Sequence, residues 1–537
     1  MSTNIQNFPG DVQIRGTTFI KANSNTNNIA IGTEAGENAQ RTLATAVGRQ
    51  AGSTNQGNSA VAVGNSAGQV SQGANSVAIG VLSGCGDQGT NSVGIGNAAG
   101  RTTQGTHSVA VGYQAGETGQ NNFAVAIGSN AGCRAQDGTV AIGTNAGRDG
   151  QGGSSVAIGP SAGCASQGTN AVAIGDDAGL IGQNNYSIAI GTNAGCRAQD
   201  GAVAVGSNAG RDGQGDSAIA IGPSAGCASQ GTSATAIGDN AGLNAQGASA
   251  VAMGYTAGRF GQGISAVSVG HEAGSNGQNT FSVAVGYRAG CAVQGVNAVA
   301  MGYTAGMNAQ GTSATAVGDS AGRLSQNNYA TALGSGAGYN AQAANATAVG
   351  YRAGYNAQGE NSVAVGRVAG SNGQGADAVA VGRGAGKDDQ GANSVAMGNG
   401  AGYNAQAANA TAVGRLAGYN AQAAKSIAMG YQAARNAQGA AAIAIGDTAA
   451  LNAQGINTVA IGLLSGCNAQ GASAVAVGVN SGRVSQGASS VAIGDSAGKT
   501  SQGANATAVG HDSGLNAQGD YCTAIGFNAG SADQGAS

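Results

Sequence analysis

The chain has 537 residues but few of the side chains that usually build a globular core or a charged surface. Tryptophan is absent, aromatic residues make up 4% of the sequence and charged residues 8%, whereas glycine occurs 101 times. Taken alone, this composition is typical of low-complexity or disordered chains. No apolar run reaches the ~18 residues that a membrane-spanning helix needs, so we predict no membrane insertion. The opening segment, MSTNIQNFPG, has neither the charged nor the apolar region of a secretory signal peptide.

Residue patterns that support catalysis or cofactor binding are also scarce. The net charge is −3 and the basic residues are scattered, which argues against a nucleic-acid partner. The sequence has no CxxC spacing for zinc and no GGxGxD repeat for calcium. The three histidines, His107, His271 and His511, lie too far apart along the chain to share a metal or a catalytic role. We therefore predict a protein that is not an enzyme and that carries no cofactor.

What the sequence has instead is one motif of 16 residues, repeated from residue 29 to the end. Residues 363–378, VAVGRVAGSNGQGADA, are a clean copy, and we number its residues as repeat positions 1 to 16. Among the copies that are followed by another, only those that begin at Val125 and Ile188 are one residue short, and we place each missing residue after position 12; the full count is 32 copies.

A period this short and regular is the signature of a solenoid, which overrides the disorder that the composition suggests. We predict an all-β fold, a parallel β-roll or β-solenoid of 32 coils of 16 residues each. At a strand spacing of ~4.8 Å, such a stack would be a rod about 150 Å long.

Several repeat positions are nearly invariant, and each has a physical explanation. Position 4 is always glycine and position 8 is glycine except at Ala434 and Ala450, which predicts two sharp corners per coil. Position 3 is always aliphatic and position 1 is Val, Ile or Thr, so we expect both on the inner face of a short strand. Position 2 lies on the opposite face and is almost always alanine, which suggests close packing against another copy of the chain. The predicted subunit interface comprises Ala78, Ala236, Ala364 and Ala492.

Position 12 is glutamine in every copy. In a parallel stack these side chains lie above one another at ~4.8 Å, where each amide can bond to its neighbours. The predicted structural column includes Gln40, Gln104, Gln246, Gln374 and Gln534. The alternative is a line of glutamines that binds a ligand.

Tyrosines and cysteines recur at a few positions of the repeat. Tyrosines share positions 5 and 9, where they either bind glycans or proteins or stack on one another. The candidate surface-binding aromatics are Tyr255, Tyr287, Tyr303, Tyr351, Tyr403 and Tyr419. Seven of the eight cysteines occupy position 9, never in neighbouring coils, so their separation of at least ~9.6 Å exceeds the ~7 Å limit for a disulfide. We predict no disulfide within the array.

Residues 1–28 stand outside the repeat and form the first of two predicted domains, and residues 29–537 form the second. Residues 11–20, DVQIRGTTFI, alternate apolar and polar on both sides of a glycine, which predicts a small hairpin. An open solenoid end exposes apolar interior and unpaired strand edges. We therefore expect residues 1–28 to cap the first coil, to serve as an attachment point, or both.

Residues 75–80, NSVAIG, and 393–398, NSVAMG, resemble the head repeats of YadA-like trimeric autotransporter adhesins. The resemblance covers residues 29–537. It implies a left-handed parallel β-roll, three chains packed side by side with the position-2 alanines facing the trimer, and binding to a host surface. The present repeat is longer than the family's and adds the glutamine column. We expect no signal peptide, coiled-coil stalk or C-terminal barrel anchor. Residues 7–12, NFPGDV, resemble the openings of fibre-type proteins in large DNA viruses of algae and protists.

These patterns predict a non-enzymatic fibre or adhesin rod, assembled as a side-by-side homotrimer on a virion surface or as an extracellular filament. Its partners would be further copies of itself, side by side or end to end, and a glycan or protein of a host surface. A second hypothesis is a structural filament that polymerises head to tail. A third, an ice-binding array, needs regular exposed threonine, whereas we expect position 1 to face inward.

Overall fold

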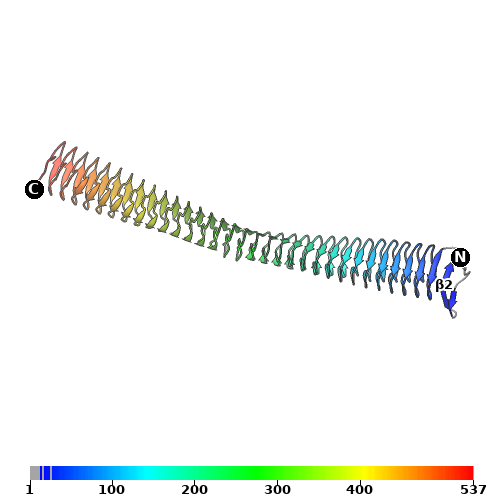
Figure 1. Cartoon of the computed structure of the whole chain (residues 1–537). Coiled ribbons are helices and arrows are strands. Elements are labelled where there is room, and N and C mark those ends of the chain that lie inside the picture. Colours follow the sequence, from blue (N-terminus) through cyan, green and yellow to red (C-terminus); the bar gives the residue numbers. More distant parts are fainter. Residues whose placement is uncertain (1–11, 15–16, 24–26, 536–537) are drawn as a thin grey trace, which may run out of the picture. The chain divides into compact units, whose positions relative to one another are not determined.

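The structure is a computed structural model that describes residues 12–14, 17–23 and 27–535. These residues form short β-strands joined by tight turns, and none of them lies in a helix. The array is a parallel β-solenoid of about 31 turns with about 16 residues each, so the prediction of an all-β parallel solenoid is confirmed. The chain divides into two compact units, Met1–Ser265 and Ala266–Ser537. In each unit the coils follow one another in sequence order (Figure 1).

Each coil contributes one strand at repeat positions 1 to 3, and most coils add a second at positions 10 to 12. The first strands run from β3 (Asn28–Ile31) to β25 (Val251–Met253) in the N-terminal unit and from β27 (Val267–Val269) to β55 (Thr523–Ile525) in the C-terminal unit. Equivalent residues pair in parallel: in β37 (Val363–Val365) and β39 (Val379–Val381), each residue faces the one 16 places later. The period of the sequence is therefore the period of the stack.

The strands at positions 10 to 12 form a separate sheet in each unit. In the C-terminal unit, twelve such strands pair without interruption, from β30 (Asn308–Gln310) to β52 (Val484–Gln486). In the N-terminal unit this sheet is broken into three pieces. They are β7 (Asp87–Gln88) with β9 (Thr103–Gln104), the strands from β13 (Asp149–Gln151) to β17 (Ile181–Gln183), and those from β20 (Asp212–Gln214) to β26 (Phe260–Gln262).

The two 15-residue coils coincide with the breaks in that sheet. In residues 125–139, Ala135 takes the inward place and Gln136 is exposed; Ala198 and Gln199 repeat this arrangement in the other short coil. Only isolated bridges continue the pairing there. The missing residue therefore precedes the glutamine, and our prediction that it follows position 12 is wrong.

Both predicted corners are seen, and glycine is needed most strictly at position 4. Gly366 has φ +129°, and a Cβ on it would lie 2.6 Å from the backbone oxygen of Gly382 in the next coil. Position 8 has φ near +50°, which Ala434 and Ala450 also adopt. Position 4 thus requires glycine for both conformation and close approach, whereas position 8 tolerates a methyl group.

The strands turn the opposite face inward from the one predicted. Position 2 is fully buried inside the coil at Ala78, Ala236, Ala364 and Ala492. Positions 1 and 3 of the same strands face outward: Val363 and Val365 are partly exposed, and Met397 is 43% exposed. The prediction that large aliphatic side chains fill the interior is wrong. The predicted alanine interface is wrong as well, because these alanines pack inside their own coil.

The reason is that the interior is narrow. It holds mostly alanine or serine at positions 2, 7 and 16, with threonine at Thr139 and Thr458 of position 16, and it holds mostly glycine at position 8 and glutamine at position 12. A Cβ on Gly370 would lie 2.6 Å from Oε1 of Gln374 and 3.2 Å from Cβ of Ala364. Because an added carbon atom at position 8 already crowds the glutamine and the alanine of position 2, valine or isoleucine does not fit at position 2, and strand alternation leaves those residues outside.

The predicted N-terminal hairpin is present. Strands β1 (Val12–Ile14) and β2 (Thr17–Asn23) pair antiparallel, and β2 also pairs antiparallel with β3 of the first coil. Figure 1 shows the hairpin at the N-terminal end of the coil stack. The hairpin therefore covers the strand edge of the first coil.

Candidate binding surface

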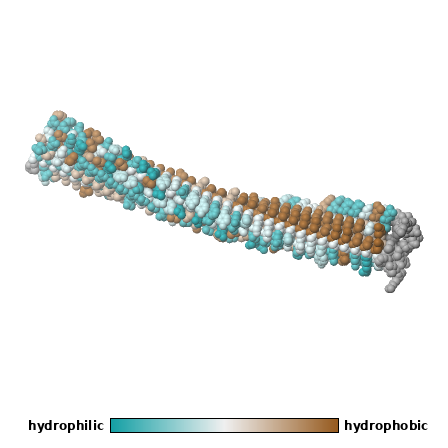
Figure 2. Space-filling model, in the orientation of Figure 1, coloured by the Kyte–Doolittle hydropathy of each residue, from teal (hydrophilic) through white to brown (hydrophobic). Residues whose placement is uncertain are grey.

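Positions 1 and 3 of successive coils form an apolar ridge on each unit, and we keep this name for those side chains. Besides Met397, Ile79 is 39% exposed and Met301 is 42% exposed, although both are large and apolar. Figure 2 shows the ridge as a brown band along the N-terminal unit. A continuous surface of this kind is typical of an interaction site rather than of a solvated face.

The glutamine column points inward and is structural. It is buried in every copy except Gln40, Gln136, Gln199 and Gln534. Nε2 of Gln374 donates to the backbone oxygens of Val363 and Ala378 at 2.8 and 3.1 Å, which closes the coil on itself.

Glutamine-to-glutamine bonds between coils are present at intervals. Gln104 donates to Gln120 at 3.3 Å, and Gln230 donates to Gln246 at 3.1 Å. The column therefore bonds mainly to its own backbone and only in part as the predicted ladder. Because it is buried, it offers no line of glutamines to a ligand.

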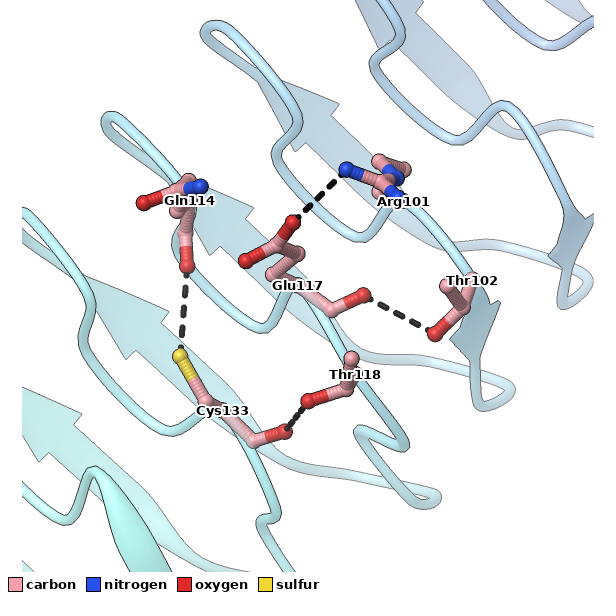
Figure 3. Close-up of polar contacts among 6 residues, drawn as sticks. All are labelled: Arg101, Thr102, Gln114, Glu117, Thr118 and Cys133. Carbon is pink, nitrogen blue, oxygen red and sulfur yellow. Dashed lines mark hydrogen bonds and ion pairs between the residues drawn. The ribbon is translucent and has the colours of Figure 1, made fainter.

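Positions 5, 6 and 9 lie on the turn between the two strands of a coil, and we call this surface the turn edge. Figure 3 shows part of it, with Arg101, Glu117 and Cys133 at position 9 of successive coils. The Arg101 guanidinium pairs with the Glu117 carboxylate at 2.9 Å. The Cys133 thiol donates to the backbone oxygen of Gln114, which is position 6 of the preceding coil, at 3.4 Å. Position 9 therefore contacts positions 9 and 6 of the coil before it.

The six candidate tyrosines all lie on the turn edge, but they do not form one cluster. Tyr255 belongs to the N-terminal unit and the other five to the C-terminal unit. Tyr287 and Tyr303 stack with ring centroids 5.0 Å apart, and Tyr403 and Tyr419 stack at 4.8 Å. Of the two alternatives, binding a glycan or protein and stacking on one another, these two pairs therefore show stacking.

Cations cover both ends of the second pair. Position 9 of four successive coils reads Lys387, Tyr403, Tyr419 and Arg435. The Lys387 ammonium lies 4.6 Å from the Tyr403 ring centroid and donates to its hydroxyl at 2.7 Å. That hydrogen bond raises the pKa of Lys387, so the ammonium stays charged at neutral pH. The Arg435 guanidinium lies 5.9 Å from the Tyr419 ring centroid, within the range of a cation–π contact.

Position 5 beside this stack carries a second set of cations. Six successive coils present Tyr351, Arg367, Arg383, Asn399, Arg415 and Tyr431. The outer guanidiniums lie near the flanking rings, Arg367 at 5.9 Å from Tyr351 and Arg415 at 5.6 Å from Tyr431. Within the described residues, none of the three arginines takes part in an ion pair.

A groove of about 410 Å³ separates the two columns. Arg383 and Arg415 line one side, Tyr403 and Tyr419 the other, and Gly400 lies between them. Of the predicted aromatics, the structure thus assigns Tyr403 and Tyr419 to this groove.

Sequence reasoning missed the glycines at position 6. Only Gly336, Gly384 and Gly400 occupy this position, and each is followed 19 residues later by a tyrosine at position 9. A Cβ on Gly384 would lie 3.1 Å from a ring carbon of Tyr403. The pairing is visible in the sequence, but its meaning depends on knowing that positions 6 and 9 of neighbouring coils touch.

The cysteines are free in the structure. Burial raises the pKa of the Cys133 and Cys164 thiols above the ordinary range. These thiols are therefore protonated at neutral pH and poor nucleophiles.

Two findings bear on other kinds of site. Over the described part of the chain, no group of three or more His, Cys, Asp or Glu side chains is placed to hold a metal ion. No helix there is long and apolar enough to cross a membrane.

Fold and surface together define a β-solenoid repeat protein, an architecture typical of non-enzymatic structural proteins. Within it, residues 357–385 match two copies of the YadA head domain repeat. The array therefore contains YadA-like head repeats, as the NSVAIG motif predicted, and it is adhesin-like in this respect. A search among curated proteins found no match.

Proposed function

We propose that the chain is a surface fibre of the adhesin type that assembles side by side with two further copies of itself. The apolar ridge is the observation that carries this proposal. Exposed apolar patches larger than roughly 300–600 Å² mark interaction sites, and the ridge recurs coil after coil. A second copy of the chain has the same coil spacing, so two ridges can match along their length.

The ridge replaces the alanines as the proposed subunit interface. In a side-by-side assembly, the aliphatic side chains at positions 1 and 3 would leave water at about 25 cal/mol per Å² of apolar surface. The likeness of residues 357–385 to YadA head repeats supports three chains and a left-handed winding of the coil as parts of this proposal.

A surface location follows from the same likeness, because YadA-like adhesins are surface-exposed. The viral setting depends on the motif at residues 7–12, of which 7–11 lie outside the described residues. We keep a virion surface as the proposed location on that sequence motif alone.

The structure removes one argument against the ice-binding hypothesis, but the threonine content still argues against it. Position 1 faces outward, contrary to the prediction that argued against it. Threonine, however, occupies position 1 in only eight of the 32 copies: Thr45, Thr235, Thr315, Thr331, Thr347, Thr411, Thr507 and Thr523. The ridge is thus apolar and not a regular hydroxyl array.

The test combines the mass in solution with oxidation of the methionines by hydrogen peroxide. Four of them, Met253, Met301, Met397 and Met429, lie at position 3, whereas Met307 lies at position 9. Met301 is exposed and Met307 only half-exposed in the single chain. We expect the mass of three chains, with slow oxidation of the four ridge methionines and faster oxidation of Met307.

Faster oxidation of Met301 than of Met307 would show that the ridge faces water and would contradict the side-by-side interface. A particle with the mass of one chain would contradict the assembly itself. Continuous filaments in electron microscopy, with the ridge methionines exposed, would favour the head-to-tail filament.

A further inference from the structure

The groove on the turn edge has chemistry that the fibre does not need for its own fold. Each position-5 arginine, Arg367, Arg383 and Arg415, is exposed. Arg367 and Arg383 lie in adjacent coils, so their backbones are ~4.8 Å apart. Like charges this close repel unless an anion lies between them. Elsewhere in the chain, position 5 holds arginine only at Arg49.

Acidic residues of these coils lie on other surfaces. Asp388 and Asp389 occupy positions 10 and 11, and Asp377 occupies position 15. Asp388 is the partner of Lys387, at 3.4 Å. Of the turn-edge cations from residue 367 to 435, Lys387 therefore has a carboxylate partner, whereas the three position-5 arginines have none within the described residues, although the whole chain has a net charge of −3.

The position-6 glycines make room for the groove. Backbone conformation does not require them, because position 6 has φ near +55° and is held by Val368, Leu416 and many other residue types in other coils. A Cβ on Gly400 would lie 2.9 Å from a terminal carbon of Leu416 and 3.4 Å from the Tyr419 ring. Glycine here removes a side chain that would otherwise fill the space between the arginines and the tyrosines.

We propose that this groove binds an acidic glycan, a polysaccharide chain that carries carboxylate or sulfate groups. Guanidinium groups bind such anions with charge-assisted, two-pronged hydrogen bonds. The Asn399 amide and the tyrosine hydroxyls supply partners for sugar hydroxyls. An extended sugar chain lying along the coils advances about one sugar for each strand spacing of ~4.8 Å, so successive coils can contact successive sugars.

A nucleic acid is the other polyanion to consider. The cations are confined to a few coils, and the faces of the groove tyrosines are already covered by each other and by Lys387 and Arg435. Bases therefore have no free ring on which to stack, whereas single-strand binding depends on such stacking. These features favour the glycan.

Binding is tested with the full chain and three probes: a sulfated and carboxylated heparin hexasaccharide, an uncharged maltohexaose and a single-stranded DNA of equal charge. The variants are Arg383→Gln with Arg415→Gln, and Gly384→Thr with Gly400→Thr, which keeps every charge but fills the groove. Arg49→Gln is the matched control, because it removes the same residue type at the same repeat position outside the groove.

We expect the wild type to bind the heparin hexasaccharide only, with affinity that falls as salt rises. Affinity should fall about tenfold or more in the double arginine variant, and also in the double glycine variant, because charge-assisted bonds and the space for them are lost. Arg49→Gln should leave affinity within about twofold, as expected for a charge outside the site. Equal losses in the Arg49→Gln and groove variants, or equally tight DNA binding, would overturn the proposal.

The groove depends on the proposed fibre function only for its setting, a fibre that meets a glycan-bearing surface. Mass in solution is measured on the same samples to separate the two. Three-chain particles that bind no glycan would overturn the groove and leave the fibre, whereas single chains that bind would overturn the assembly and leave the groove.

Discussion

At the scale of single residues, the interior of the coil is filled by small side chains. Ala364 and Ala369 are fully buried, while the larger Val363 and Val365 lie partly exposed on the same coil. Gln374 fills the remaining space, and its Nε2 donates to the backbone oxygens of Val363 and Ala378, so its buried amide nitrogen is satisfied. Burial in this array therefore follows the available volume rather than the hydrophobicity of the side chain.

Because Ala364 points into the coil and Val363 points out of it, we predict that substitutions at these two residues change stability by different amounts. Ala364→Val should lower the local stability of its coil by about 1–3 kcal/mol, because extra methyl groups overpack a filled interior. Val363→Thr should change it by less than about 0.5 kcal/mol, because position 1 lies outside the coil and eight other copies already hold threonine there. Amide hydrogen exchange of residues 363–378 measures both. A larger loss for Val363→Thr than for Ala364→Val would mean that position 1 faces the interior after all.

Each coil depends on its neighbours at the scale of the element. Strands of three residues are too short to be stable alone, and they persist because they pair in register with the strands of neighbouring coils, as β37 does with both β35 and β39. The 15-residue coils of the N-terminal unit differ from the others because the glutamine column is interrupted at Ala135 and Ala198, and their second strand is reduced to isolated bridges, as it is in some 16-residue coils.

We therefore predict that the N-terminal unit opens first at its short coils. Amide hydrogens of residues 125–139 and 188–202 should exchange about tenfold faster than those of residues 172–187, one of the three 16-residue coils between them, because fewer strand hydrogen bonds must break. Hydrogen exchange with mass spectrometry resolves these peptides. Uniform protection across residues 125–202 would show that the missing residue costs the stack nothing.

At the scale of the molecule, the stack can be lengthened or shortened by whole repeats. Contacts run between equivalent positions of neighbouring coils, so the register is conserved whenever 16 residues are added or removed. The turn-edge columns are continuous for the same reason, which is how residues 16 apart in sequence form one groove.

Deleting residues 299–314, one complete repeat, should leave a folded protein with unchanged assembly. Deleting residues 299–306 instead should disrupt the fold, because it brings glycine corners and alanine strand positions out of register. Circular dichroism and mass in solution compare the two. Equal stability of both deletions would contradict a register-dependent stack.

Much of the fold could be predicted from the sequence because the repeat is strict. The period, the parallel register, the corners at positions 4 and 8 and the stacked glutamine column all follow from residues that recur at one spacing. The candidate site was predictable only in part: Tyr403 and Tyr419 were identified as surface aromatics, but their groove needs Gly384, Gly400 and the arginines of position 5.

The sequence by itself therefore determined the architecture and the period of the stack, because local conformation and repetition are properties of the chain alone. The tertiary structure decided which face of the strand lies inside. Alternation along β37 separates Ala364 from Val363 and Val365, but only the width of the closed coil shows that alanine fits and valine does not. It also decided that positions 6 and 9 touch across coils, and so turned scattered glycines and tyrosines into a candidate binding site.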